Sequence, residues 1–256
     1  MQVPCPTAGG DSCQKHLMNR FFLYSPLVLQ TAIWPIVRPL FRFFLHLKIS
    51  GLENLKSAYN YGRTYAIKKG VIFAVNHSSE LDAVLVPASL PFLSPLMPMF
   101  YTSREQAFYR QSGWRQILYG GFLFKLWGSH ALHSGKKDYE VSLQTHIKIL
   151  EKGRSICIFP DGKRLPESDI GTIAHGGIGY LAWRTKAPIV PVRISGAYRI
   201  TPADFFLRRR SVSVAFGRSL SPAEIFGENA AKPTPEVCKD AARRVMERIR
   251  GMPKMW

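Results

Sequence analysis

Short apolar runs recur along the chain and predict the strands of a buried sheet. Each run is rich in β-branched and aromatic residues and stops at a polar or turn-forming residue. The runs cover residues 71–75, 97–102, 155–159, 189–194 and 212–216. Segments with helical periodicity fall between several of them, and strands that alternate with helices are typical of α/β folds. We therefore expect a single layered α/β domain, with a mixed, largely parallel sheet flanked by helices.

Two of the intervening segments carry strong helix signals. Residues 138–153 have an apolar face and end at a glycine. That face contains Tyr139, Leu143, Ile147 and Leu150. A Thr-Pro pair at 234–235 opens a last helix. Its predicted apolar face consists of Val237, Ala241, Val245 and Ile249. The polar residues 57–70 predict a loop or a short strand connection.

An uncharged stretch of 17 residues, 21–37, precedes the strands. It is at the short limit for a membrane-spanning helix, and Pro26 and Pro35 are expected to interrupt it. Residues 38–48 continue with apolar side chains between basic ones, which is typical of helices that lie in a membrane interface. The alternative is an amphipathic helix that covers the core of a soluble protein.

The chain is thus expected to consist of a leader at 1–20, a membrane-associated helical segment at 21–48 and one folded domain at 49–251. The leader lacks the apolar core and cleavage site of a secretory signal peptide. The four cysteines of the chain show no metal-binding spacing, so we expect free thiols and no metal site.

The charge balance indicates a polyanionic partner. The 256 residues include 35 Lys and Arg against 17 Asp and Glu, a net charge of +18. Such an excess suits nucleic acid, an anionic membrane surface or phosphorylated substrates. A nucleic-acid-binding protein is one hypothesis, motivated by this charge and by the run Arg208–Arg210. The chain shows no helix-turn-helix, RNA-recognition or zinc pattern in its favour.

The most specific candidate chemistry follows the run at 71–75. Asn76 and His77 come directly after it, and Asp82 lies five residues beyond the histidine. A carboxylate-oriented histidine just past the carboxyl end of a buried strand suits a general base. Two structural explanations compete. Ser79 and Asp82 fit a helix-capping box, and His77 fits an ordinary turn residue.

A second polar turn follows the run at 155–159. It reads Phe-Pro-Asp-Gly-Lys-Arg and presents Asp161, Lys163 and Arg164. The lysine supplies a mobile point charge and the arginine a bidentate fork, which together suit a phosphate group. An ordinary solvated Pro-Asp-Gly turn is the alternative.

Taken in order, Asn-His-x4-Asp, Phe-Pro-Asp-Gly-Lys-Arg and the later segment 187–192 (Ala-Pro-Ile-Val-Pro-Val) resemble the 1-acylglycerol-3-phosphate acyltransferase family of membrane-bound glycerolipid acyltransferases. In that family the His-x4-Asp pair is catalytic, and a Phe-Pro-Glu-Gly-Thr-Arg-Ser segment binds the acceptor phosphate. The resemblance therefore implies that His77 and Asp82 are catalytic. It also implies a substrate-phosphate site made of Asp161, Gly162, Lys163 and Arg164.

The chain departs from the family pattern at several positions. Where the family has Glu, Thr and Ser, this sequence has Asp161, Lys163 and Leu165. The family also carries an arginine between the two motifs, and that position corresponds to Ser134, or to His133 in a shifted register. Lys163, Lys136 or Lys137 are candidates to replace it. The acceptor is therefore open between a lysophosphatidic acid-like molecule and another lysolipid or amino-lipid.

The resemblance implies transfer of a fatty acyl group from acyl-CoA or acyl-carrier protein to an acceptor hydroxyl in phospholipid biosynthesis, without a cofactor. The expected partners are membrane lipids, the thioester donor and a lysophospholipid acceptor, with no nucleic acid, at the cytoplasmic face of a membrane. His77 is expected to act as general base while Asp82 accepts its Nδ1 proton. Backbone N–H groups at the helix start after Ser79 are candidate oxyanion donors. A non-catalytic membrane protein descended from such an enzyme is a further alternative.

Overall fold

A computed structural model describes residues 10–64, 70–103, 122–132, 138–228 and 231–254. Its centre is a seven-stranded sheet in the order β1-β7-β6-β2-β5-β3-β4. The strands are β1 Lys48–Ser50, β2 Ile72–Val75, β3 Met99–Ser103, β4 Ser129–Ala131, β5 Ser155–Ile158, β6 Ile189–Ser195 and β7 Ser213–Phe216. Neighbouring strands run parallel except β6 and β7. The predicted mixed, largely parallel sheet is confirmed.

The side chains of β2 divide the core into two layers. Phe73 and Val75 lie in one apolar cluster, whereas Ile72 and Ala74 lie in the other. This division follows from the two-residue period of a strand, because all four side chains are buried and successive ones point to opposite faces. Both faces of the sheet must therefore be covered by other elements.

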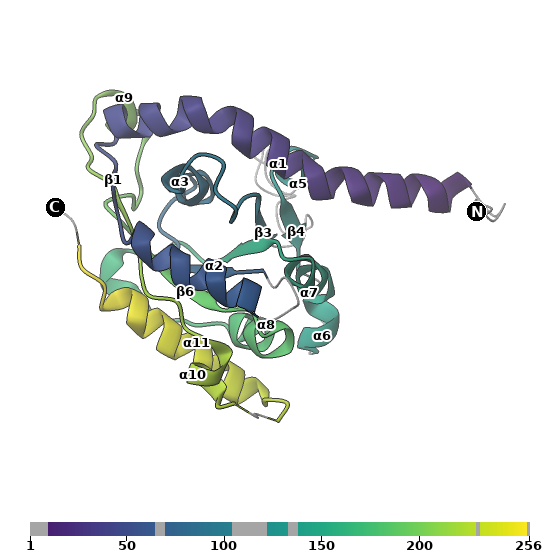
Figure 1. Ribbon diagram of the computed structural model, residues 1–256. Helices are drawn as coiled ribbons and strands as arrows, with labels where there is room; N and C mark the ends of the chain where they lie inside the picture. Colours follow the sequence, from purple (N-terminus) through teal and green to yellow (C-terminus); the bar gives the residue numbers. More distant parts are fainter. Residues whose placement is uncertain (1–9, 65–69, 104–121, 133–137, 229–230, 255–256) are drawn as a thin grey trace.

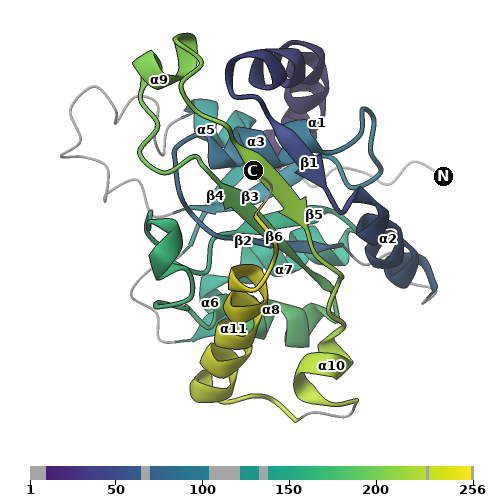
Figure 2. The ribbon, with the colours of Figure 1, turned by 90° about the vertical axis from the view of Figure 1, so that its left-hand side faces the viewer.

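Helices cover both faces (Figures 1 and 2). Residues of α1 Gly10–Phe44, α2 Leu55–Thr64 and α3 Asp82–Ser89 contribute to or pack against the cluster of Phe73. Residues of α7 Gln144–Glu151, α8 Gly177–Thr185 and α11 Pro235–Arg250 lie in the cluster of Ile72. Shorter helices complete the described part of the chain: α5 Phe122–Leu126, α6 Tyr139–Ser142, α9 Pro202–Phe206, α10 Pro222–Phe226, and the 3-10 turns η1 Leu52–Asn54 and η3 Glu167–Asp169.

The prediction for the polar residues 57–70 was wrong. The polar stretch 57–70 is not a loop where the structure describes it, because α2 extends through Thr64. This helix buries only one side, through Leu55 and Ala58, which explains its polar composition. The helical segment predicted over 138–153 is present, but it is divided into α6 and α7 at Leu143, whose backbone leaves the helical region (φ −107°, ψ 7°).

The last helix starts where it was predicted to start. Thr234 caps α11, and its hydroxyl accepts a hydrogen bond from the Val237 N–H. Ala241, Val245 and Ile249 are buried as expected, but Val237 is 45% exposed and Cys238 is buried in its place. The first turn of α11 faces solvent on the side of Val237. The buried apolar face of the helix therefore begins at Cys238, one residue later.

The N-terminal segment forms one continuous helix, α1, which passes through Pro26 and Pro35. The prediction that these prolines interrupt the helix was therefore wrong. Contacts with the domain support it: Gln30 donates to the carbonyls of Met99 and Trp127. Trp34 donates to the Leu90 carbonyl, and Arg38 donates to the last carbonyls of α3. These side chains recur every four residues, so one face of α1 is fixed to the domain.

Several large apolar side chains in the described part of α1 are exposed. They are Phe21, Tyr24, Leu27, Val28, Ile36, Leu40 and Phe43. In the described part of the chain, one segment, Phe21–Phe44, is long and apolar enough to cross a membrane, with a mean hydropathy of 1.2. The helix starts at Gly10, inside the segment expected to be a leader.

Candidate active site

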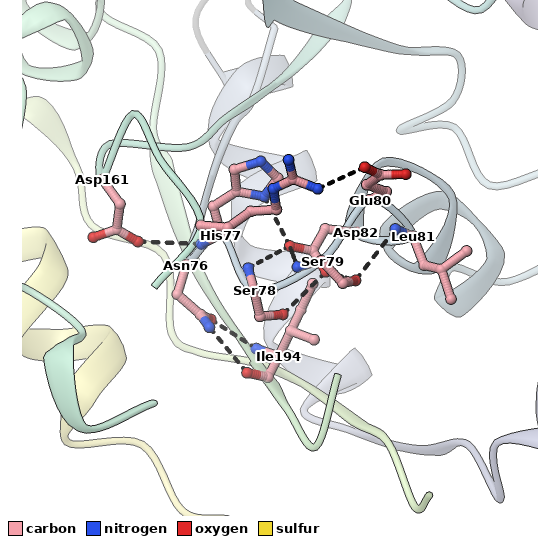
Figure 3. Close-up of polar contacts among 10 residues, drawn as sticks. Asn76, His77, Ser78, Ser79, Glu80, Leu81, Asp82, Asp161 and Ile194 are labelled. Atoms are coloured by element: carbon pink, nitrogen blue, oxygen red, sulfur yellow. Dashed lines mark hydrogen bonds and ion pairs between the residues drawn. The ribbon is translucent and has the colours of Figure 1, made fainter. Parts of the chain in front are cut away.

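The two polar turns meet at one edge of the sheet. β2 and β5 are parallel neighbours, so the residues that follow them emerge side by side. Asn76, directly after β2, fixes the start of its turn. Its amide donates to the Ile194 carbonyl over 2.9 Å and its carbonyl accepts from the Ile194 N–H over 2.8 Å. The backbone is therefore anchored one residue before His77 (Figure 3).

His77 and Asp82 form a directly hydrogen-bonded pair. Nδ1 of the imidazole lies 2.9 Å from Oδ2 of Asp82, whose side chain is fully buried. The same carboxylate accepts hydrogen bonds from the N–H groups and the hydroxyls of Ser78 and Ser79. Since Asp82 acts only as an acceptor in this network, the matching tautomer of His77 donates from Nδ1. Nε2 is then the acceptor nitrogen, on a side chain that is 25% exposed.

The serine-to-aspartate turn differs from the predicted capping box. Helix α3 begins at Asp82, and the Ser79 hydroxyl accepts from the Leu81 N–H rather than from the Asp82 N–H. The Ser79 carbonyl accepts from the Asp82 N–H at 3.5 Å. The N–H groups expected to serve as oxyanion donors at this helix start are thus engaged locally at Leu81 and Asp82.

The turn after β5 holds His77 from three directions. The His77 N–H donates to Oδ2 of Asp161 over 3.1 Å, and the His77 carbonyl accepts from the Leu165 N–H over 2.9 Å. The ring of Phe159 stacks on the imidazole, with centroids 4.4 Å apart. Backbone and ring of His77 are therefore both positioned by the segment 159–165, more than eighty residues away in sequence.

Asp161 is turned inward rather than towards solvent. It is 1% exposed, and among the described residues its Oδ1 has no hydrogen-bond partner. Burial raises the pKa of this carboxyl to about 6, against the opposing effect of the N–H groups of His77 and Gly171. Its carboxylate faces the His77 backbone, and an anion gains nothing from a carboxylate neighbour. This geometry favours an orienting role over the phosphate contact predicted for it.

The other predicted phosphate-binding residues lie at the outer side of the same turn. Lys163 and Arg164 are exposed, and Arg164 donates to Oε1 of Glu80 over 2.7 Å. Both partners of this ion pair are more than a third exposed, so the pair contributes little and an incoming anion can displace it. Gly162 adopts φ +64°, and a Cβ there would lie 2.7 Å from the His175 ring. Ser134, His133, Lys136 and Lys137 lie outside the described residues.

For three residues of the site, the role that the structure shows was not assigned from the sequence, although Asn76 and Phe159 belong to the two motifs. Asn76 anchors the strand end, Phe159 orients the imidazole and Glu80 pairs with Arg164. The sequence does carry a signal for Asn76: an asparagine at the end of a fully apolar strand is expected to be buried, and a buried amide must find hydrogen-bond partners. The other two depend on the approach of distant segments. Within the described ranges, no three His, Cys, Asp or Glu side chains gather in a way that could hold a metal ion.

Fold and site together define an α/β enzyme class in which a buried carboxylate orients a histidine at the carboxyl edge of a largely parallel sheet. Residues 46–195, more than half of the chain, match the family model described as "Acyltransferase", and the chain belongs to this acyltransferase family. The resemblance inferred from the motifs is confirmed at this level. Membership identifies an enzyme of lipid metabolism that uses an acyl donor and an acceptor.

A curated relative adds a more specific similarity. Over 134 residues the chain is 25% identical to the "Probable 1-acyl-sn-glycerol-3-phosphate acyltransferase" of Mycoplasma pneumoniae (strain ATCC 29342 / M129 / Subtype 1). The match covers 51% of this chain and 46% of that protein, so the chain spans about half the length of the curated relative it matches.

Proposed function

We propose that this acyltransferase moves a fatty acyl group from acyl-CoA or acyl-carrier protein to the hydroxyl of a lysophosphatidic acid-like acceptor in phospholipid biosynthesis. The observation that carries the proposal is the environment of His77. A buried carboxylate fixes one nitrogen of the imidazole, and the segment 159–165 fixes the backbone and the ring plane. A general base must be held in a fixed position and orientation, so that its free nitrogen can reach the proton that it accepts.

In the proposed mechanism, Asp82 keeps the proton of His77 on Nδ1, so that Nε2 accepts the proton of the acceptor hydroxyl. The hydroxyl oxygen attacks the thioester carbonyl, the new C–O bond forms and the C–S bond breaks. The leaving thiolate takes up the proton from Nε2. A thiol pKa of about 8.5 means that this leaving group needs little acid assistance. Asp161 contributes by holding the backbone of His77 in position.

We assign binding of the acceptor phosphate to Lys163 and Arg164, with Gly162 providing the tight turn that exposes them. Two points support this assignment. The cations belong to the segment that holds His77, and Leu165, which follows Arg164, donates its N–H to the His77 carbonyl. The relative from Mycoplasma pneumoniae carries the name of an enzyme with a phosphate-bearing acceptor. Another lysolipid or an amino-lipid stays the alternative acceptor.

The proposed site of action is a membrane surface on the cytoplasmic face. One side of α1 is bonded to the domain through Gln30, Trp34 and Arg38, while several of its exposed side chains are large and apolar. A helix whose C-terminal half is held against the domain in this way suits an orientation in the plane of the interface. The observation supports the interfacial arrangement predicted for residues 21–48.

The test uses the full chain in nonionic detergent with radiolabelled acyl-CoA or acyl-carrier protein and a panel of lysolipids. His77→Ala and Asp82→Asn are expected to lower kcat by 10²–10⁴-fold, the usual contribution of general base catalysis. His46→Ala, which changes an exposed histidine between α1 and β1, is the matched control. Full turnover by the His77 variant would exclude the proposed base.

Arg164→Gln addresses the acceptor. It is expected to raise KM for lysophosphatidic acid far more than for lysophosphatidylcholine, because only the former presents a terminal phosphate for bidentate binding. Equal effects on both acceptors would reject the proposed phosphate site while leaving the base intact.

A further inference from the structure

Three large apolar side chains are exposed where α9 meets the C-terminal end of α1. Phe206 is 67% exposed, Leu207 is 58% exposed and Phe43 is 54% exposed. Phe206 ends the short helix α9 and Leu207 follows it directly, and both side chains face solvent. Exposed apolar groups that gather in this way indicate an interaction surface.

Contacts with α1 give this surface a defined shape. Phe205 stacks on Phe44 with ring centroids 5.0 Å apart. Arg208 donates from Nε to the Phe43 carbonyl over 3.1 Å, and its guanidinium lies 4.2 Å from the Phe43 ring centroid. The tip of α9 is thus fixed to the end of α1, and both views show the two elements together (Figures 1 and 2).

Positive charge borders the apolar side chains. Arg208, Arg209 and Arg210 follow Leu207 directly, and all three are exposed. The nearby carboxylate of Asp204 lies 3.9 Å from Arg210 and also accepts from the Thr201 hydroxyl. One carboxylate against three guanidinium groups leaves a positive surface. We refer to Phe43, Phe206, Leu207, Arg209 and Arg210 as the α1–α9 surface.

Strand register puts this surface at the same edge of the sheet as His77. Lys48 at the start of β1 pairs with Ser213, which pairs with Ser195 at the end of β6. β6 runs parallel to β2, so its end lies at the edge where β2 delivers His77. The end of α1 and the tip of α9 therefore flank the edge that carries the candidate active site.

We propose that the α1–α9 surface docks on an anionic lipid bilayer, with Phe206 and Leu207 in the interface and Arg209 and Arg210 at the headgroups. The aromatic and aliphatic side chains match the acyl-chain boundary of a bilayer, and the arginines match its anionic headgroups. A nucleic acid has no apolar layer that exposed Phe and Leu side chains could enter. The surface continues the exposed apolar side chains of α1 and turns the His77 edge towards the bilayer. This inference rests on the proposed function, because it explains how a lipid acceptor reaches the site.

The test places an environment-sensitive NBD label at position 207. Leu207→Cys is prepared in the full chain with Cys5 and Cys13 changed to serine, since Cys157 and Cys238 are buried. Asp240→Cys on α11, at the side of the molecule away from α1, is the matched label position (Figure 1). Vesicles of phosphatidylcholine with phosphatidylserine are expected to shift the emission of the label at 207 to the blue, and not that of the label at 240.

Charge variants test the headgroup contact. Arg209→Gln with Arg210→Gln is expected to lower the inserted-to-exposed ratio of the label about 25-fold, since one arginine at an anionic surface is worth about fivefold. Arg243→Gln with Arg244→Gln removes the same charge from exposed positions on α11 and is expected to change the ratio little. Circular dichroism confirms that both variants fold.

Three results would overturn the proposal: an unshifted label at 207 on vesicle-bound protein, an equal shift with pure phosphatidylcholine, or a shift with duplex DNA and none with vesicles. Acyl transfer in detergent is measured on the same proteins. Protein that transfers acyl groups without inserting its label rejects only the docking surface, and protein that inserts without transferring rejects only the proposed function.

Discussion

At the scale of single residues, two carboxylates reach His77 from different sides. Asp82 binds the ring, and Asp161 binds the backbone N–H. Their surroundings differ: serine hydroxyls and N–H groups surround the first, whereas one oxygen of the second is buried without a hydrogen bond among the described residues. Burial raises the pKa of the Asp161 carboxyl to about 6.

Asp161→Asn is expected to change how stability depends on pH. The pKa of Asp161 is about 6 in the folded protein and 3.8 in an unfolded reference, so the folded state binds this proton more tightly. Its stabilising contribution is complete below pH 3.8 and is lost as pH rises through 6. Asparagine stays neutral, so above pH 7 the variant should be more stable by about 2–3 kcal/mol.

The measurement is thermal unfolding of both proteins in nonionic detergent between pH 4 and pH 8. The two melting temperatures should converge at pH 4 and separate by several degrees at pH 8. A difference that stays constant with pH would show that Asp161 does not titrate as proposed.

At the scale of elements, the site depends on how firmly the ends of two strands are joined. Asn76 carries this role, since its amide completes the hydrogen bonding between β2 and β6 beyond the last ladder pair. His77 follows it directly, so any movement of this strand end is passed to the imidazole.

Asn76→Ala should lower the free energy of unfolding by about 2–5 kcal/mol, because the Ile194 N–H and carbonyl would both stay buried and unpaired. Asn54→Ala is the matched control. It removes one partly buried hydrogen bond to the Phe216 carbonyl and should cost about 1 kcal/mol. Urea titrations of both variants measure the difference, and similar losses would argue against the anchoring role.

At the scale of the whole molecule, Arg193 ties the central sheet to the C-terminal helix. This β6 side chain is 5% exposed and donates to the carbonyls of Arg250 and Met252, each over 2.6 Å. It also pairs with Glu167 at 3.4 Å. Arg193 thereby joins β6, the strand beside β2, to the C-terminal end of α11.

Arg193→Met should lower the free energy of unfolding by about 3–5 kcal/mol, because the carbonyls of Arg250 and Met252 both lose a charged hydrogen-bond donor. Glu167 keeps its ion pair with Lys254. Arg184→Met is the control, since Arg184 pairs with Glu140 and Glu151 at exposed positions and should cost less than about 1 kcal/mol. Urea titration gives both values. An Arg193 variant as stable as the control would remove Arg193 from this role.

The local pattern of apolar residues was sufficient to predict the strands that consist of continuous buried apolar runs. β2, β5, β6 and β7 fall where the sequence predicted them, since each buries both of its faces. β1 and β4 span three residues each, too few for a period to be detected. The helix α1 continues through its prolines because Gln30, Trp34 and Arg38 bind the domain, which no local rule can include.

The sequence by itself determined the α/β class, the His77–Asp82 spacing and the acyltransferase family, because these are encoded in contiguous residues. Only the tertiary structure decided where the Asp161 side chain lies. Its turn lies beside His77 because β2 and β5 are neighbours, and the His77 N–H donates to its Oδ2. The same holds for the α1–α9 surface, whose parts lie more than 160 residues apart in the chain. Contacts between residues so far apart in the sequence depend on the order of the strands in the sheet, and local sequence patterns do not specify that order.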